Sequence, residues 1–268
     1  MRATSKIATL PLLHAGLGLL MWSGMTAALL QLKPDGASTL HRLQLLGLMT
    51  GVGLTLAGAI ARRLAGTTLP SSRRSAVLLG AALAAAALLV TLLATGLRTS
   101  AGPALVALGV ALLFAGFGAV ASIATDFAGA DAPPAWRHPL VLPVQLLLAM
   151  GTGLALLYLL MDRLFVSGSD ARTMLATLTG LGACLALCKW LYWRALDATA
   201  WRDVRVLVPV LLAGGPLLAW MLALAASVPA PASLGLSAVA MLAAAVLDAR
   251  HFIAAGIATD RRDSGHAS

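Results

Sequence analysis

Long apolar runs separated by short polar stretches dominate this chain. We count eight runs of about twenty residues, at 8–31, 43–61, 75–97, 103–125, 139–161, 173–193, 204–227 and 233–257. Runs of this length are typical of membrane helices, because a helix satisfies its own backbone polar groups inside hydrocarbon. The pattern therefore predicts an all-α polytopic membrane protein with eight transmembrane helices, forming a single integral membrane domain over residues 1–268.

The composition supports this interpretation. The chain is 60% hydrophobic and only 11% charged, whereas soluble domains carry about a quarter charged residues. Arg2 and Lys6 precede the first run as in a signal peptide, but no clear small-residue cleavage site follows. We therefore expect the first run to be a retained membrane helix.

The basic residues are distributed unevenly between the two sides of the membrane. The net charge is +9, which in a soluble protein would suggest a nucleic-acid partner. If the N-terminus marks side A of the membrane, only five of the 19 Lys and Arg residues lie on the opposite side B: Lys33, Arg42, Arg98, Arg163 and Arg172. Because Lys and Arg concentrate in cytoplasmic loops, the bias predicts a bacterial inner-membrane protein with both termini cytoplasmic and no nucleic-acid partner.

Glycine and proline positions predict how the helices pack. Gly47 and Gly51 have the GxxxG spacing that brings two membrane helices close together, and Gly214-Gly215-Pro216 predicts a kink in the seventh run. Leu10-Pro11 with Gly16-Leu-Gly18 is similar to Leu142-Pro143 with Gly151-Thr-Gly153. This similarity is consistent with a pseudo-repeat of residues 1–130 and 131–268, arranged as two four-helix bundles.

Polar groups that enter the membrane gather near side A, and their types suit a quinone. A quinone head group needs hydrogen-bond donors for its carbonyls, aromatic or apolar walls, and a proton acceptor during quinol oxidation. Asp248 and His251 share a helix face because they are three residues apart. The candidate quinol-binding residues are His14, Trp136, His138, Asp248, Arg250 and His251.

Two other uses of these residues are open. Haem b needs two facing imidazoles, which His14 with His138 or His251 would supply, but no helix carries two histidines at a ligating spacing. Cys184 and Cys188 alone do not complete a metal site and suit helix packing, so we expect no bound metal.

Basic and aromatic residues on side A suit either membrane anchoring or docking of a partner subunit. The docking candidates are Arg62, Arg63, Arg73, Arg74, Trp190, Trp193 and Arg194.

Three short motifs and the eight-span topology resemble the membrane anchor subunits of dimethyl sulfoxide reductase-type molybdoenzymes. The segment Asp131-Ala-Pro-Pro-Ala-Trp-Arg-His-Pro-Leu140 is similar to that family's Pro-x-Trp and Pro-Leu at the junction of helices four and five. The run 192–197, "YWRALD", is similar to the exit of helix six in some relatives. Arg250 and Phe252 in "DARHF" resemble an Arg-x-Phe element of the last helix.

The resemblance implies an anchor subunit that exchanges electrons with membrane quinol, either menaquinone or ubiquinone. Such anchors assemble with an iron–sulfur subunit and a molybdopterin catalytic subunit, serve anaerobic respiratory electron transport, usually carry no haem, and are not enzymes alone. Family members commonly have His-Leu-Gly at the end of helix two and an acidic residue near the start of helix three. Residues 61–66 and 71–77 contain neither, so no residue of these two segments is assigned to quinol.

Two alternatives to a quinol-linked anchor follow from the sequence. One is a small-molecule transporter or permease. Transporters usually place ionisable groups near the bilayer midplane, and the runs 8–31, 43–61, 75–97, 139–161 and 173–193 carry none at mid-depth. The other alternative, an anchor without its own redox site, is favoured by the missing histidine in residues 61–66.

Overall fold

The computed structural model describes residues 2–30, 38–64, 71–95, 102–129, 132–164, 170–196, 202–225 and 228–265. Side chains are not described for 2–8, 30, 38–39, 202–205 and 256–265. The first six spans are α1 (Arg2–Leu30), α2 (Ser38–Leu64), α3 (Arg73–Ala94), α4 (Gly102–Phe127), α5 (Val141–Arg163) and α6 (Ala171–Ala195). The seventh span consists of α7 (Arg202–Pro209), the π-helix η3 (Val210–Gly214) and α8 (Gly215–Leu224), and the last is α9 (Ala230–Gly265).

The predicted fold class is confirmed. Over the described ranges the chain forms helices and no strand, and eight of its segments are long and apolar enough to cross a membrane. Asp131 and Asp197, which belong to the sequence motifs above, lie outside the described residues.

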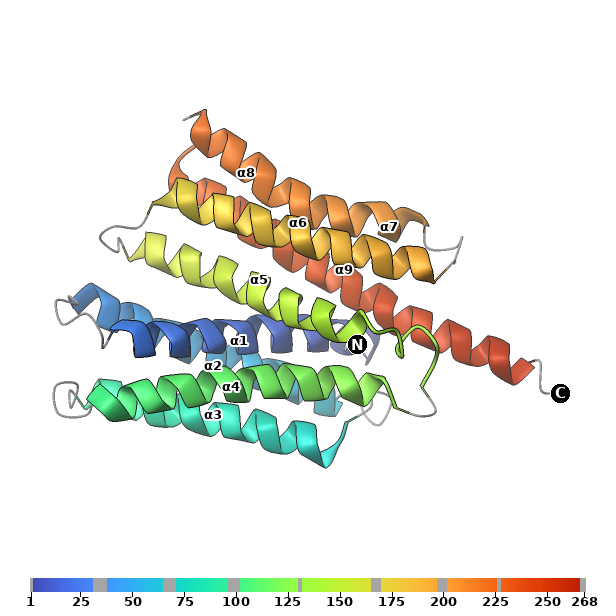
Figure 1. Ribbon diagram of the computed structural model, residues 1–268, viewed down its shortest axis with the longest axis horizontal. Helices are drawn as coiled ribbons and strands as arrows, with labels where there is room; N and C mark the ends of the chain where they lie inside the picture. The colour runs from blue at the N-terminus through green and yellow to red at the C-terminus, as the bar shows by residue number, and fades with distance from the viewer. Residues whose placement is uncertain are drawn as a thin grey trace.

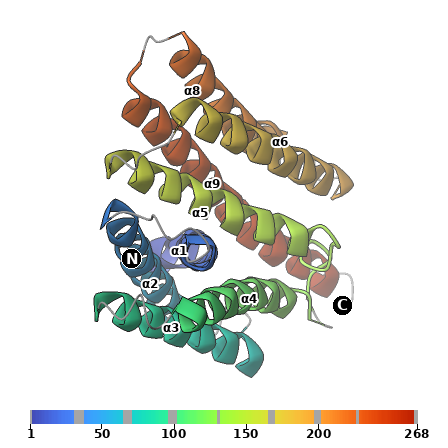
Figure 2. The same cartoon turned by 60° about the vertical axis from the view of Figure 1, so that its left-hand side comes forward.

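The helices form two neighbouring groups that meet at α1 and α5. Figures 1 and 2 show α1, α2, α3 and α4 on one side, and α5, α6, α8 and α9 on the other. Helix α1 contacts α2, α4, α5 and α9 and is the most buried of the eight spans, while α3 and the seventh span are the least buried. The start of α1 and the end of α9 lie at the same end of the molecule, to the right in Figure 1.

Glycines allow α1 to lie close to its neighbours. A Cβ atom at Gly18 would overlap the carbonyl of Ala149, and one at Gly153 would overlap the backbone of Gly18. Gly51 of the GxxxG pair packs against Leu20, as the spacing predicts. The indole N–H of Trp22 also donates to the carbonyl of Met150 over 2.9 Å, which fixes α1 to α5.

The seventh span is interrupted where the sequence predicts a kink. Pro216 has no N–H to donate to the carbonyl of Leu212, and the π-helical turn Val210–Gly214 ends two residues before it. That carbonyl instead faces Gly182 of α6, where a Cβ would overlap the Leu212 oxygen. The missing side chain at Gly182 thus lets α6 lie against the carbonyl of Leu212, to which Pro216 cannot donate.

Candidate functional site

Four helices bring polar side chains together near side A. His14 comes from α1, Gln145 from α5, Lys189 and Tyr192 from α6, and Asp248 from α9. These five residues, here called the buried polar cluster, are each no more than 4% exposed. Their surroundings are Leu10, Val141, Val144, Leu148, Ala245, Ala249 and Phe252, and the two alanines leave space beside α9.

An ion pair lies at the centre of the buried polar cluster. The Lys189 Nζ atom is 2.6 Å from Oδ1 of Asp248, and the two side chains are only 3% and 6% exposed. The ammonium also lies 4.8 Å from the ring centre of Tyr192, 5.8 Å from that of Trp193 and 6.0 Å from that of Phe252. An isolated charge in such a place would be very unfavourable, so the carboxylate and the aromatic faces together stabilise the buried cation.

The buried polar cluster encloses a small cavity. Its volume is about 10 Å³, close to what one water molecule requires. His14 Nε2 and Gln145 Oε1 have no hydrogen-bond partner among the described residues, although the Gln145 side chain contacts His14. A quinone ring or a porphyrin does not fit into this space.

The junction between α4 and α5 covers the cluster on side A. The Tyr192 hydroxyl donates to the carbonyl of Ala135 and the Trp136 indole N–H donates to the carbonyl of Phe252, each over 2.9 Å. Trp136 also stacks on Phe252 and packs edge-on against Phe127. Residues 132–140 are thereby fixed to both α6 and α9, which separates the cluster from the side-A surface.

The candidate quinol residues do not all meet. His14 and Asp248 lie together in the cluster, and Trp136 and His138 pack on its outer wall, where the His138 ring meets Tyr192 edge-on. His251 is partly exposed, one turn from Asp248. Arg250 is exposed on another face of α9 and does not line the cavity.

Gln145, Lys189 and Tyr192 were not among the residues predicted for this site. Lys189 lies inside the apolar run 173–193, three residues before Tyr192, so both side chains lie on one helix face. A lysine within an otherwise apolar run was the available signal, since such residues usually have a partner inside the protein.

The docking candidates fall into two groups. Arg63, Arg73, Arg74 and Arg194 are exposed, and the guanidinium of Arg194 lies 5.2 Å from the ring centre of Trp190, which is 43% exposed. Trp193 is fully buried beside Lys189, so it does not offer a docking surface. Arg62 is partly buried, with its side chain 14% exposed, and it forms an ion pair within the chain.

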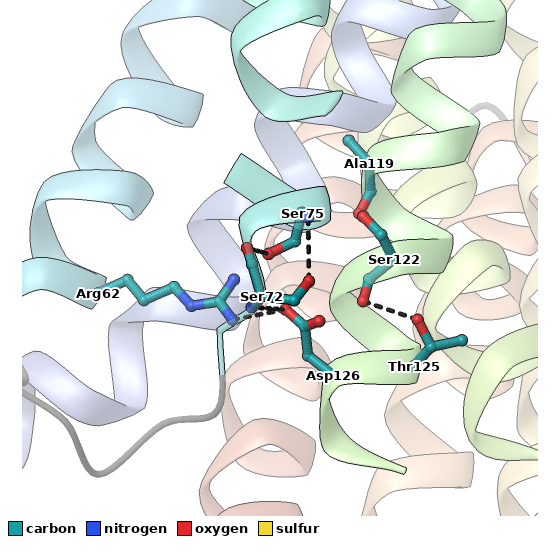
Figure 3. A network of polar contacts seen from close by, with 7 residues as sticks. All are labelled: Arg62, Ser72, Ser75, Ala119, Ser122, Thr125 and Asp126. Carbon is teal, nitrogen blue, oxygen red and sulfur yellow. Dashed lines mark hydrogen bonds and ion pairs between the residues drawn. The ribbon is translucent and has the colours of Figure 1, made fainter. Parts of the chain in front are cut away.

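Figure 3 shows this second ion pair, between Arg62 at the end of α2 and Asp126 at the end of α4. Arg62 Nη2 is 3.3 Å from Asp126 Oδ2, which also accepts the backbone N–H of Ser72 over 3.1 Å. Ser72 caps α3 by accepting the N–H of Ser75 over 3.1 Å. Arg62, Ser72, Ser75 and Asp126, here called the helix-end clasp, therefore connect α2, α3 and α4.

An apolar groove lies on a neighbouring face of α1 and α9. Its volume is about 300 Å³, at the lower end for ligand pockets. Seven apolar residues line it: Pro11, Leu12, Ala15, Leu54, Leu156, Leu242 and Val246. Pro11 lies three residues before His14 and Ala15 directly after it, and Val246 follows Ala245 of the cavity wall. One stretch of α1 and one of α9 therefore contribute to both the groove and the cluster.

No metal-ligand group of three or more His, Cys, Asp or Glu side chains occurs within the described ranges. Comparisons of the chain with protein-family models, with curated proteins and with solved structures gave no match.

Proposed function

We propose that this protein is the membrane-embedded subunit of an oxidoreductase complex and exchanges electrons and protons with membrane quinol. The observation that carries the proposal is the buried polar cluster, in which an ion pair and a histidine lie within membrane-spanning helices. Ionisable groups at such positions are costly and are usually retained for function.

The cluster has the groups that quinol chemistry requires. Oxidation of a quinol releases two electrons and two protons, and the protons need acceptors close to the ring hydroxyls. His14 Nε2 and the Asp248 carboxylate are acceptors, and the Lys189 ammonium is a donor to a quinone carbonyl. Since the cavity is large enough for only one water molecule, the quinol ring binds in the adjacent apolar groove.

The electrons then leave to a partner, for which we propose an iron–sulfur subunit assembled with a molybdopterin subunit. The exposed arginines Arg63, Arg73, Arg74 and Arg194 provide a basic surface on side A that suits a partner with acidic residues. The bias of basic residues toward side A supports a cytoplasmic position for this surface and for both chain ends.

Purification of the complex with its native partners tests this function. Electron transfer from menadiol in native-membrane vesicles should fall at least tenfold when Lys189→Met and Asp248→Leu are combined, because the buried charges are lost together. Arg163→Gln serves as the control, because Arg163 is exposed on side B and belongs to neither the cluster nor the docking surface, and this variant should retain quinol turnover. Purification of a lone polypeptide without quinol oxidation would contradict the proposal, and unchanged turnover in the double variant would indicate an anchor without its own redox site.

A second candidate is a small-molecule transporter, which the Lys189–Asp248 pair favours. Transporters use buried ionisable pairs to couple solute and ion binding. A transporter would move solute across vesicles that contain this chain alone, whereas a quinol-exchanging subunit requires its electron-accepting partner.

A further inference from the structure

The small cavity and the polar groups around it suggest a water-binding site, which the proposed function does not specify. We propose that one water molecule binds between His14, Gln145 and Asp248, and that this water, Asp248 and His251 form a proton path from the membrane interior to side A. That the protons come from quinol rests on the proposed function. The water site and the proton path do not depend on it.

The first argument is the match between the cavity and its polar wall. A volume of about 10 Å³ suits a single water, and buried waters bind where two or more polar groups lack partners. His14 Nε2 and Gln145 Oε1 are two such groups, since neither has a hydrogen-bond partner within the described ranges. His14 is 3% exposed and Gln145 is 4% exposed, so bulk solvent does not satisfy them.

The second argument is the ionised carboxylate in the same wall. Asp248 is held next to Lys189 at 2.6 Å, and the carboxylate of this ion pair is a proton acceptor. A proton that arrives at His14 Nε2 passes to the water as the water gives one of its own protons to Asp248. The ion pair becomes a neutral carboxyl beside the lysine ammonium until the proton moves on.

The third argument is the position of His251. It lies three residues beyond Asp248 on α9, on the same helix face and about 4.5 Å closer to side A. His251 is partly exposed, whereas Asp248 is buried. His251 can therefore take the proton from Asp248 and release it to water at side A, which restores the ionised carboxylate.

The neighbouring groups at the cluster are engaged elsewhere. The Tyr192 hydroxyl donates to Ala135, and His138 Nδ1 accepts the backbone N–H of Leu140 over 3.2 Å. Residues 132–140 also cover the cluster on this side through Trp136 and Phe252. The face of α9 that carries Asp248 and His251 is thus the route to side A.

Solid-state NMR of the ¹⁵N-histidine-labelled full chain in liposomes, without quinol, tests the path. The probe is exchange of the His14 ring N–H with D₂O, with the signal assigned by its loss in His14→Gln. We expect measurable exchange in the unmodified chain and at least tenfold slower exchange in His251→Phe. The conservative His251→Gln serves if the phenylalanine variant does not fold.

His41→Phe is the matched control, because His41 lies at the opposite end of the bundle, and it should leave the His14 rate within twofold. Absence of His14 exchange over hours in the unmodified chain would show a dry cavity and overturn the water site. An unchanged rate in both His251 variants, or slowing by His138→Phe instead, would overturn the path. Normal exchange together with absent quinol oxidation would contradict only the proposed function.

Discussion

The two ion pairs near side A differ in how their carboxylates are satisfied. In the helix-end clasp, Asp126 accepts a backbone N–H from Ser72 besides its contact with Arg62 at 3.3 Å, and it lies where α2, α3 and α4 begin or end. In the buried polar cluster, Asp248 meets Lys189 at 2.6 Å in the interior of α6 and α9, beside a cavity and a histidine with an unpartnered nitrogen.

This difference separates a structural pair from a candidate functional one. The clasp has the features of a helix connection, because Asp126 pairs with Arg62 and accepts the Ser72 N–H, and these bonds join three helix ends. The cluster has a buried charge pair with unsatisfied neighbours, an arrangement that is costly for folding and therefore needs another explanation.

The largest predicted effect follows from breaking the buried pair. Lys189→Met leaves the Asp248 carboxylate buried without its cation and should lower the free energy of unfolding by about 3–5 kcal/mol. Combining it with Asp248→Leu should restore most of the stability, because two apolar side chains replace the pair. Unfolding by SDS in mixed micelles measures both; a double variant as unstable as the single one would contradict this description of the pair.

A smaller effect is expected in the helix-end clasp. Asp126→Ala removes the acceptor of the Ser72 N–H and the partner of Arg62, and should cost about 2 kcal/mol. Ser72→Ala removes the cap of α3 and the contact of the Ser72 hydroxyl with Asp126 but keeps the backbone N–H that Asp126 accepts, and should cost about 1 kcal/mol. Both variants should keep wild-type menadiol oxidation in the assembled complex, and a loss of turnover at retained assembly would place the clasp in the functional site.

The smallest effect concerns Asp170, a carboxylate on side B that forms no ion pair with another described residue. Asp170 caps α6 by accepting the Thr173 hydroxyl at 2.6 Å and the backbone N–H of Arg172 at 3.1 Å. The bond from Thr173, followed by that from Arg172, holds the pKa of Asp170 below its usual value. The cap therefore contributes stability above the usual Asp pKa and loses it as the pH falls through the lowered value.

Asp170→Asn keeps the capping oxygen but does not titrate in this range. The variant should show a weaker loss of stability between neutral pH and pH of about 3, measured by the same SDS unfolding. An identical acid dependence in variant and parent would show that other carboxylates account for it.

The fold was predictable from local properties of the chain. Eight apolar runs predict eight spans because hydrocarbon allows few other backbone structures, and Pro216 predicts the interruption of the seventh span because it lacks an N–H. The close contact of Gly51 with Leu20 also follows from the GxxxG spacing of Gly47 and Gly51.

The site was only partly predictable. His14 and Asp248 were recognised as polar residues at similar depth, and the structure brings them to one cavity. Arg250 differs from Asp248 by only two positions, but two residues on a helix point about 200° apart, so it is exposed. Trp193 is typical of an interface by residue type, yet the contact between α6 and α9 buries it beside Lys189.

The sequence by itself determined the number of spans, the helix breaks and the uneven distribution of basic residues, because these depend on residues close together in the chain. The tertiary structure decided which charges are paired and which cavity they line. Lys189 and Asp248 lie on different helices far apart in the sequence, and only the packing of α6 against α9 brings them within 2.6 Å. A residue type defines what a side chain can do, whereas its partners and its exposure to solvent depend on the neighbouring helices.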